Sequence, residues 1–210
     1  GHDKLAIAVM TTKFWGAGGV KLTVAFASGT GAVYADKILS HMNAWGQFCN
    51  ATFVAAAGGR GQIRISFGAG GYWSYLGTDI LQIPANQPTM NLQGFNRSGI
   101  PESEYRRVVR HETGHCLGAV HEHARRAIVA RLDQQKTIDY FGRTQGWSSE
   151  EVRQQVLTPM EESSLMGTPE AETDSVMTYS LPGSITIDGK AIPGGTDITE
   201  HDGAFLGKLY

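Results

Sequence analysis

The sequence lacks several features that would assign the protein to common functional classes. Its 210 residues contain 18 lysines and arginines against 20 aspartates and glutamates, for a formal net charge of −2. No basic run is present either, so neither a nucleic-acid partner nor an anionic-membrane partner is expected. No apolar stretch reaches the roughly 18 residues that a membrane-spanning helix requires. The apolar run at residues 5–10 is also too short for a signal peptide, so no signal is expected within this chain.

Cysteine is scarce, which excludes a fold held together by many disulfides. The chain has only Cys49 and Cys116, and they are not spaced as a CxxC pair. One bridge and two buried thiols are both open from the sequence, because a thiol packs well as a small apolar group. A hydrophobic content of 41% in 210 residues is sufficient for one domain with a substantial core.

The first half of the chain contains strand patterns, a helix pattern and many glycines. We expect five strands, at residues 21–27, 52–56, 62–67, 79–83 and 89–95. The apolar spacing of residues 31–48 predicts an amphipathic helix between the first two strands. Residues 68–77 read as a glycine-rich and aromatic loop, and the last two strands as an antiparallel pair at a sheet edge. A strand, a helix and a strand in succession favour a right-handed crossover and a mixed sheet.

The second half contains weaker patterns of regular structure. Residues 132–141 and 148–157 predict two helices, the second with a capping signal at its start. Residues 184–192 predict a hairpin that turns at Asp188 and Gly189. A closing helix is expected to begin near Thr199.

A metal-binding pattern lies at the centre of the chain, on a helix expected to begin near Pro101 and to end at Gly118. His111 and His115 are four residues apart, so they project from one face of that helix. Two imidazoles placed in this way can bind one metal ion. Glu112 then stands where the general base of a zinc metalloprotease stands.

A third histidine extends this pattern to H-E-x-x-H-x-x-G-x-x-H. A straight helix would not bring His121 to the same metal, but Gly118 can adopt the left-handed conformation that ends a helix and turns the chain back. Three neutral imidazoles leave an open position for water, as a catalytic zinc site requires. Ligands that are all nitrogen favour zinc, with cobalt and manganese as alternatives.

This pattern, followed by a methionine within residues 175–179, resembles the signature of the metzincin clan of zinc peptidases. Three segments are similar to the astacin family in particular. Residues 121–125, H-E-H-A-R, resemble its H-E-H-x-R, and residues 175–179, S-V-M-T-Y, resemble its S-I-M-H-Y. Residues 71–77, G-Y-W-S-Y-L-G, resemble its G-C-W-S-Y-V-G. The chain therefore looks like an astacin-like metzincin.

Other positions depart from the astacin pattern. Tyr72 stands where astacins have a cysteine, and two cysteines cannot form the two usual astacin disulfides. Gly114 with residues 117–118 is closer to the matrixin form H-E-x-G-H-x-L-G. Residues 126–174 match neither family, whereas the end of the chain resembles the last helix common to both.

The resemblance implies an α+β fold of two lobes forming a single metallopeptidase catalytic domain. The upper lobe, about residues 1–118, would contain a mixed, twisted five-stranded sheet and two long helices. The irregular lower lobe, about residues 119–210, would end in a C-terminal helix. The protein would be a secreted monomer that acts on proteins or peptides.

The resemblance also implies roles for the central residues. His111, His115 and His121 would bind one zinc ion. Glu112 would take a proton from the zinc-bound water and pass it to the leaving amine. An inactive, zinc-bound protein-binding module and a zinc hydrolase of small molecules are the alternatives to this endopeptidase.

Further roles follow from the same resemblance. Tyr179 would bind zinc at rest and then stabilise the oxyanion, with a plain buried tyrosine as the alternative. Met177 would form an apolar floor beneath the ligands, and Glu122 would meet the N-terminus of the mature chain. A substrate would bind as an added strand at a sheet edge. The residues expected at that edge are Asp79, Ile80, Leu81, Gln82 and Ile83.

Overall fold

A five-stranded sheet forms the centre of the structure. The structure is a computed structural model, and it describes residues 9–121, 126–161, 164–166 and 173–210. The strands lie in the order β3-β2-β4-β6-β5. Their bounds are β2 (Val20–Phe26), β3 (Ala51–Ala55), β4 (Ile63–Ser66), β5 (Tyr72–Ser74) and β6 (Met90–Leu92). β2 is parallel to β3 and β4, and β4 is parallel to β6, whereas β5 runs antiparallel to β6. The sheet is therefore mixed, as the sequence predicts, and β5 is at one edge.

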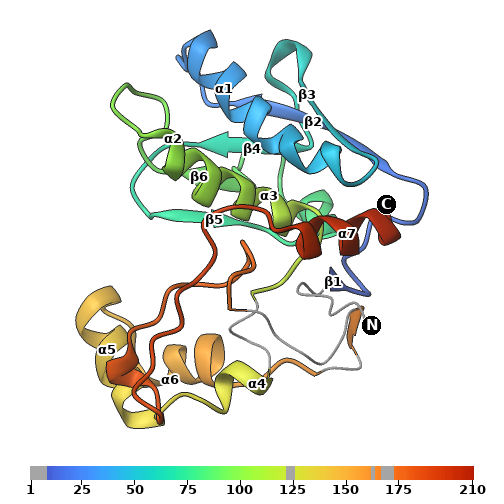
Figure 1. Cartoon of the computed structure of the whole chain (residues 1–210). Coiled ribbons are helices and arrows are strands. Elements are labelled where there is room, and N and C mark those ends of the chain that lie inside the picture. The colour runs from blue at the N-terminus through green and yellow to red at the C-terminus, as the bar shows by residue number, and fades with distance from the viewer. Residues whose placement is uncertain (1–8, 122–125, 162–163, 167–172) are drawn as a thin grey trace.

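Two helices pack beside each other against this sheet (Figure 1). The first, α1 (Ala32–Met42), continues into a 3-10 segment, Asn43–Gln47, and connects β2 to the parallel strand β3. The second consists of α2 (Glu102–Glu104), a π-helical turn η4 (Tyr105–Val109) and α3 (Arg110–Cys116). The fully buried Trp45 ties the two together, because its indole Nε1 donates to the Arg110 carbonyl at 2.9 Å.

The middle of the chain forms a second, smaller helical region with its own core. It contains α4 (Arg126–Val129), α5 (Gln134–Gln145) and α6 (Ser149–Val152), the last continuing into a π-helical turn η6 (Arg153–Leu157). Ser148 and Glu151 cap α6 reciprocally, as the sequence predicts. The buried side chains of this core are Ile128, Leu132, Val152, Val156, Leu181, Ile185 and Ile192.

The two ends of the described chain return to the main core. β1 (Val9–Met10) pairs with β7 (Leu165–Met166), and the Met10 amide also donates to the Gly118 carbonyl at 3.1 Å. At the other end, α7 (Glu200–Leu209) buries its apolar side against the core that contains Trp45. Both ends thus lie close to the point where α3 stops (Figure 1).

The fold class is confirmed, but three local predictions are wrong. Residues 79–83 do not form a strand: Gly77–Gln82 is the 3-10 segment η3. The edge strand is instead β5, within the segment expected to be a loop. No strand hairpin forms at residues 184–192, where isolated bridges join Leu181 to Ile192 and Leu132 to Thr186.

A tertiary contact explains why residues 79–83 turn instead of extending. Gly77 has φ of 44°, and a Cβ there would overlap the Lys13 carbonyl. Lys13 also accepts a hydrogen bond from the Thr78 amide and pairs its ammonium with Asp79 at 2.5 Å. The extended propensity of Ile80 and its neighbours is overridden by these contacts with a segment more than 60 residues away.

Two further points bear on the chemistry of the chain. Cys49 and Cys116 are both buried and both free, so the two-thiol alternative holds. Among the described residues, no helix combines the length and apolarity needed to cross a membrane.

Candidate metal centre and active site

The helix α3 carries the first two histidines and ends in a turn that brings in the third. His111 and His115 are buried on its inner face. Gly118 has φ of 87°, and two hydrogen bonds close the turn, from the Gly118 amide to the His115 carbonyl at 2.8 Å and from the Ala119 amide to the Gly114 carbonyl at 3.0 Å. This is the Schellman arrangement that glycine favours, and it confirms the predicted helix end.

The three imidazoles converge through their Nε2 atoms. The Nε2 atom of His121 lies 3.1 Å from that of His111 and 2.8 Å from that of His115, and all three ligand atoms lie within 4.8 Å of one another. A tetrahedral ion with nitrogen ligands at 2.0–2.1 Å holds those nitrogens roughly 3.3 Å apart. The three histidines are therefore placed to hold one zinc ion.

Hydrogen bonds on the other ring nitrogens fix the tautomers of two ligands. The Nδ1 atom of His111 lies 2.7 Å from the Val176 carbonyl, and that of His115 lies 2.7 Å from the Ala119 carbonyl. A carbonyl can only accept, so both Nδ1 atoms are protonated and both Nε2 atoms present lone pairs. Burial also lowers the pKa of His115 to about 4, which keeps this imidazole neutral.

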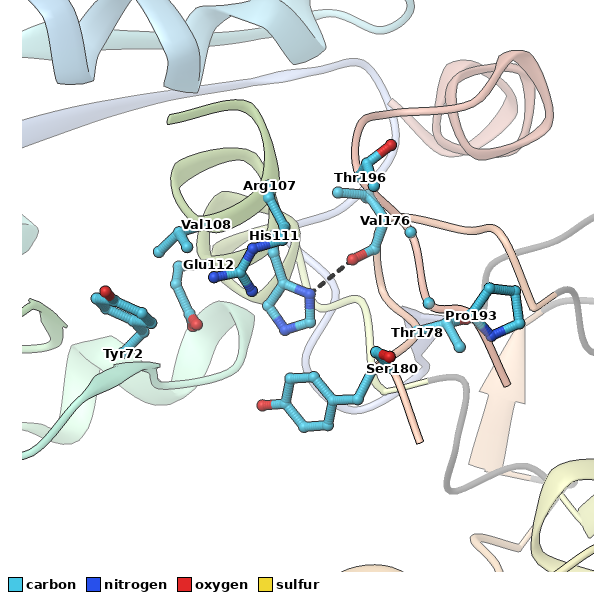
Figure 2. Close-up of a pocket in the computed structure, with 13 residues that line it drawn as sticks. Tyr72, Arg107, Val108, His111, Glu112, Val176, Thr178, Ser180, Pro193 and Thr196 are labelled. Atoms are coloured by element: carbon cyan, nitrogen blue, oxygen red, sulfur yellow. Dashed lines mark hydrogen bonds between the residues drawn. The ribbon is translucent and has the colours of Figure 1, made fainter. Parts of the chain in front are cut away.

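A buried carboxylate on α7 holds the carbonyl that orients His111. Asp202 is fully buried, and its two oxygens accept from the Ser175 hydroxyl at 2.7 Å and from the Val176 amide at 3.0 Å. The same carboxylate caps its own helix by accepting from the Thr199 amide at 3.1 Å. α7 thus holds Val176, the residue whose carbonyl bonds to the His111 ring. Figure 2 shows that bond between His111 and Val176.

Met177 lies against the helix that carries His111 and His115. Its side chain is fully buried and faces α3 at Gly114, where an added Cβ would come 2.5 Å from Sδ. Next to it, Gly195 packs on the Ser175 carbonyl so closely that a Cβ would overlap it. Both glycines permit backbone approaches that a side chain would prevent.

Glu112 is a buried carboxylate beside the converging histidines. Only 3% of its surface is exposed, and its Oε2 atom has no hydrogen-bond partner in the described protein. Burial raises the pKa of Glu112 to about 8, and the nearby guanidinium of Arg107 offsets part of this rise. Figure 2 shows the carboxylate between Tyr72 and His111. Glu112 lines a cavity of about 160 Å³. An acceptor in this position can exchange protons with a molecule bound at the metal.

The ring of Tyr179 lies against the rings of His111 and His121. Its ring stacks on His111 with centroids 5.3 Å apart and planes at 16°, and its centroid lies 4.3 Å from that of His121. Burial and the adjacent Glu112 raise the pKa of Tyr179 above its ordinary value. The phenol is therefore protonated at neutral pH unless a metal ion binds it.

Comparisons with known proteins agree with this geometry. No protein-family model matches the chain, and no curated protein matches it. Among solved structures, one of myroilysin is 29% identical, covers 96% of this chain and 97% of its own, and superposes with a TM-score of 0.87. A second myroilysin structure is also 29% identical, with coverages of 95% and 86% and a TM-score of 0.70.

A third solved structure, high choriolytic enzyme 1, is a hatching enzyme zinc-protease from the medaka fish Oryzias latipes. It is 18% identical, covers 93% of both chains and has a TM-score of 0.61, so it shows a shared fold. Fold, motif and histidine geometry now agree. Together with the similarity to these structures, they support an astacin-like metzincin.

The structure places most but not all of the residues predicted for the site. His111, Glu112, His115, His121 and Tyr179 come together, with Met177 beneath them. Glu122 lies outside the described residues.

The predicted substrate edge is corrected by the structure. The residues proposed for it were Asp79, Ile80, Leu81, Gln82 and Ile83, and η3 takes up all but the last of these. A 3-10 segment cannot accept an added strand, because its backbone groups do not form a ladder. In the described chain β5 pairs with β6 alone, so β5 presents the open edge next to the metal helix.

The sequence patterns did not identify Arg107 and Asp202 as residues of the site or its surroundings. Arg107 lies four residues before His111, and this spacing alone puts it on the ligand face of the helix. Asp202 forms a capping pair with Thr199, and that local role hides its second contact with residues 175 and 176. Helical spacing could have identified Arg107, whereas the role of Asp202 is visible only in the tertiary fold.

Proposed function

We propose that this protein is a zinc-dependent endopeptidase in which Glu112 is the general base. The observation that carries the proposal is the set of three Nε2 atoms within 4.8 Å of one another, beside a buried carboxylate with an unpartnered oxygen. A purely structural zinc site would need neither that carboxylate nor an open cavity next to it.

The residues of the chain divide the chemistry between them. Zinc held by the three Nε2 atoms would polarise the scissile carbonyl and lower the pKa of a water molecule. Glu112 takes the proton from that water and returns it to the leaving amine nitrogen. Its buried position keeps bulk water from competing for its carboxylate.

Tyr179 is proposed to act twice at the same site. At rest its hydroxyl would help to hold the zinc, and in the reaction it would donate a hydrogen bond to the oxyanion. The stacking of its ring on His111 supports this proposal, because it places the phenol beside the ligand cluster. Gly118 and Met177 are structural: the first turns the chain toward His121, and the second supports α3.

The substrate is proposed to bind as an extended peptide antiparallel to β5. The scissile bond would then lie over the metal, between the cavity at Glu112 and a second cavity beside His115. We further propose that the chain is a single catalytic domain, with an upper lobe to about residue 118 and a lower lobe from about residue 119. It would act as a secreted monomer, which culture fractionation and size-exclusion chromatography would check.

Cleavage of a protein substrate tests the function directly. The purified protein should cut casein or gelatin, lose this activity to a zinc chelator, regain it with added zinc, and lose it in Glu112→Ala. Turnover that survives both chelation and Glu112→Ala would contradict the assignment as a zinc endopeptidase. Stoichiometric zinc with no turnover would indicate a binding module, and hydrolysis of small esters alone would indicate a small-molecule hydrolase.

A further inference from the structure

A second cavity, of about 330 Å³, is lined by His115 and His121 but not by Glu112. Its upper wall includes Ser74 and Leu76, at the end of β5 and just beyond it, and its floor includes His115 and His121. Its far wall comes from the π-helical turn η6 and the residues after it, where Gln154, Gln155, Thr158 and Met160 line the space. We call this space the Gln155 pocket. It joins the sheet edge to the part of the chain that resembles neither astacins nor matrixins.

The direction of a bound substrate follows from two independent observations, and both rest on the proposed function. A peptide antiparallel to β5 runs from the Ser74 end of that strand toward the Tyr72 end. Tyr72 lines the Glu112 cavity, and Ser74 lines the Gln155 pocket. The residues before the scissile bond therefore meet the Gln155 pocket.

The position of the general base leads to the same direction. Glu112 must return a proton to the leaving nitrogen, which belongs to the residue after the scissile bond. Glu112 lines only the first cavity, so that residue lies there. The Gln155 pocket is left for the residues that precede the bond.

The π-helical turn η6, which carries Gln155, is anchored on both sides to the core of the smaller helical region. Val152 and Val156 are buried there, whereas Gln154 and Gln155 are exposed. Gln154 is already engaged, because its Nε2 atom donates to Glu150 at 2.7 Å. A π-helical turn is uncommon and is often found at functional sites. Here it presents the Gln155 carboxamide on a fixed backbone.

We propose that Gln155 is a specificity-determining residue that selects an uncharged side chain among the residues preceding the scissile bond. Leu76, Val120 and Met160 offer apolar contacts, and the carboxamide offers both a donor and an acceptor. Apart from the two metal ligands, the described residues lining the pocket carry no ionisable side chain. A charged side chain would lose hydration there without gaining a counter-charge, whereas a side chain with an apolar body and a neutral polar end fits.

Charge substitution at position 155 tests this assignment. Wild type, Gln155→Glu and Gln155→Lys are loaded with zinc and given a peptide library whose half after the scissile bond is invariant. The three residues before the bond are varied one at a time. Wild type should prefer neutral side chains at one of these positions. At that position Gln155→Glu should raise relative kcat/KM for lysine and arginine, and Gln155→Lys should do so for aspartate and glutamate, each by about fivefold.

Control variants at an exposed position and three contradicting results accompany this test. Gln145→Glu and Gln145→Lys make the same changes at an exposed position on α5 that does not line the pocket, and they should leave all preferences unchanged. Full turnover with unchanged preferences in both Gln155 variants would overturn the role of Gln155 alone. A shift confined to positions after the bond would overturn the binding direction. A zinc-loaded wild type that cleaves nothing would overturn the proposed function, and this assignment with it.

Discussion

Gly114 of the metal-binding helix lies directly against Met177, so closely that a Cβ on the glycine would come 2.5 Å from the methionine sulfur. The same Cβ would lie 3.3 Å from the ring of the buried Trp45. Gly114 sits between the two zinc ligands of α3, one residue before His115. The height of the helix above its apolar floor, and hence the position of both ligands, depends on this contact.

Gly114→Ala should therefore weaken the site although alanine is the better helix former. Alanine gains about 1 kcal/mol of helix propensity, whereas overpacking a buried contact costs about 1–3 kcal/mol. We expect a lower unfolding temperature and weaker zinc binding, measured by thermal melts and by competition with a chromophoric chelator. Gly142→Ala in α5 is the control, because a Cβ there would meet its nearest neighbour at an ordinary 3.6 Å. Equal zinc affinity in wild type and Gly114→Ala would show that Met177 does not set the helix position.

Asp202→Asn should lower both stability and zinc affinity. The Asp202 oxygens accept hydrogen bonds from Ser175, Val176 and Thr199, and an amide group would direct N–H against at least one of these donors. The loss of stability should be about 3 kcal/mol in denaturant unfolding. Zinc affinity should fall with it, because Val176 orients His111. Glu200→Gln, an exposed change in the same helical turn, should alter neither quantity.

Tyr179→Phe should separate zinc binding from turnover. The phenylalanine ring keeps the stacking on His111 but removes the hydroxyl that we assign to the oxyanion. Loss of one such donor lowers kcat by about 100- to 1000-fold. Zinc stoichiometry should stay at the wild-type value. Wild-type kcat in this variant would leave Tyr179 a structural residue only.

His41 should make the stability of the fold depend on pH. It is a buried residue of α1, where its Nε2 atom pairs with Glu102 at 2.8 Å and its Nδ1 atom accepts from Arg110 at 3.3 Å. Burial lowers the pKa of His41 in the folded protein below its ordinary value of 6.5, with Glu102 opposing and Arg110 and Lys37 adding to the effect. The unfolded chain therefore takes up the proton first as pH falls.

The sign of this dependence can be measured. Above pH 6.5 His41 is neutral in both states and contributes nothing to pH dependence. Below it, the free energy of unfolding should fall by up to about 1.4 kcal/mol per pH unit until the folded protein also takes up the proton. His41→Gln should reduce this slope in urea unfolding between pH 7 and pH 5. An unchanged slope would mean that the histidine is not held neutral by the fold.

The sequence was informative wherever function depends on local spacing. The interval between His111 and His115 places both on one helical face, and glycine at position 118 predicts the left-handed turn that brings in His121. The strands β2, β3, β4 and β6 and the helix α1 were likewise predictable, because their apolar periodicity matches burial against a single core.

The sequence was uninformative wherever contacts between residues far apart in the chain determine the local structure. Residues 79–83 have strand propensity, but their contacts with Lys13 turn them into a 3-10 segment. β5 is only three residues long and lies among glycines, so its pairing with β6 is visible only in the fold. The contact of Asp202 with residues 175 and 176 spans 26 or 27 positions and carries no motif.

The central claim is that Glu112 does chemistry at a zinc ion held by three histidines, and one paired measurement tests it most directly. Zinc content per chain and the cleavage rate of a single peptide are measured on the same samples of wild type and Glu112→Gln. We predict one zinc ion per chain in both proteins and a cleavage rate at least about 100-fold lower in the variant. Zinc-loaded Glu112→Gln that cleaves the peptide at the wild-type rate would contradict the account.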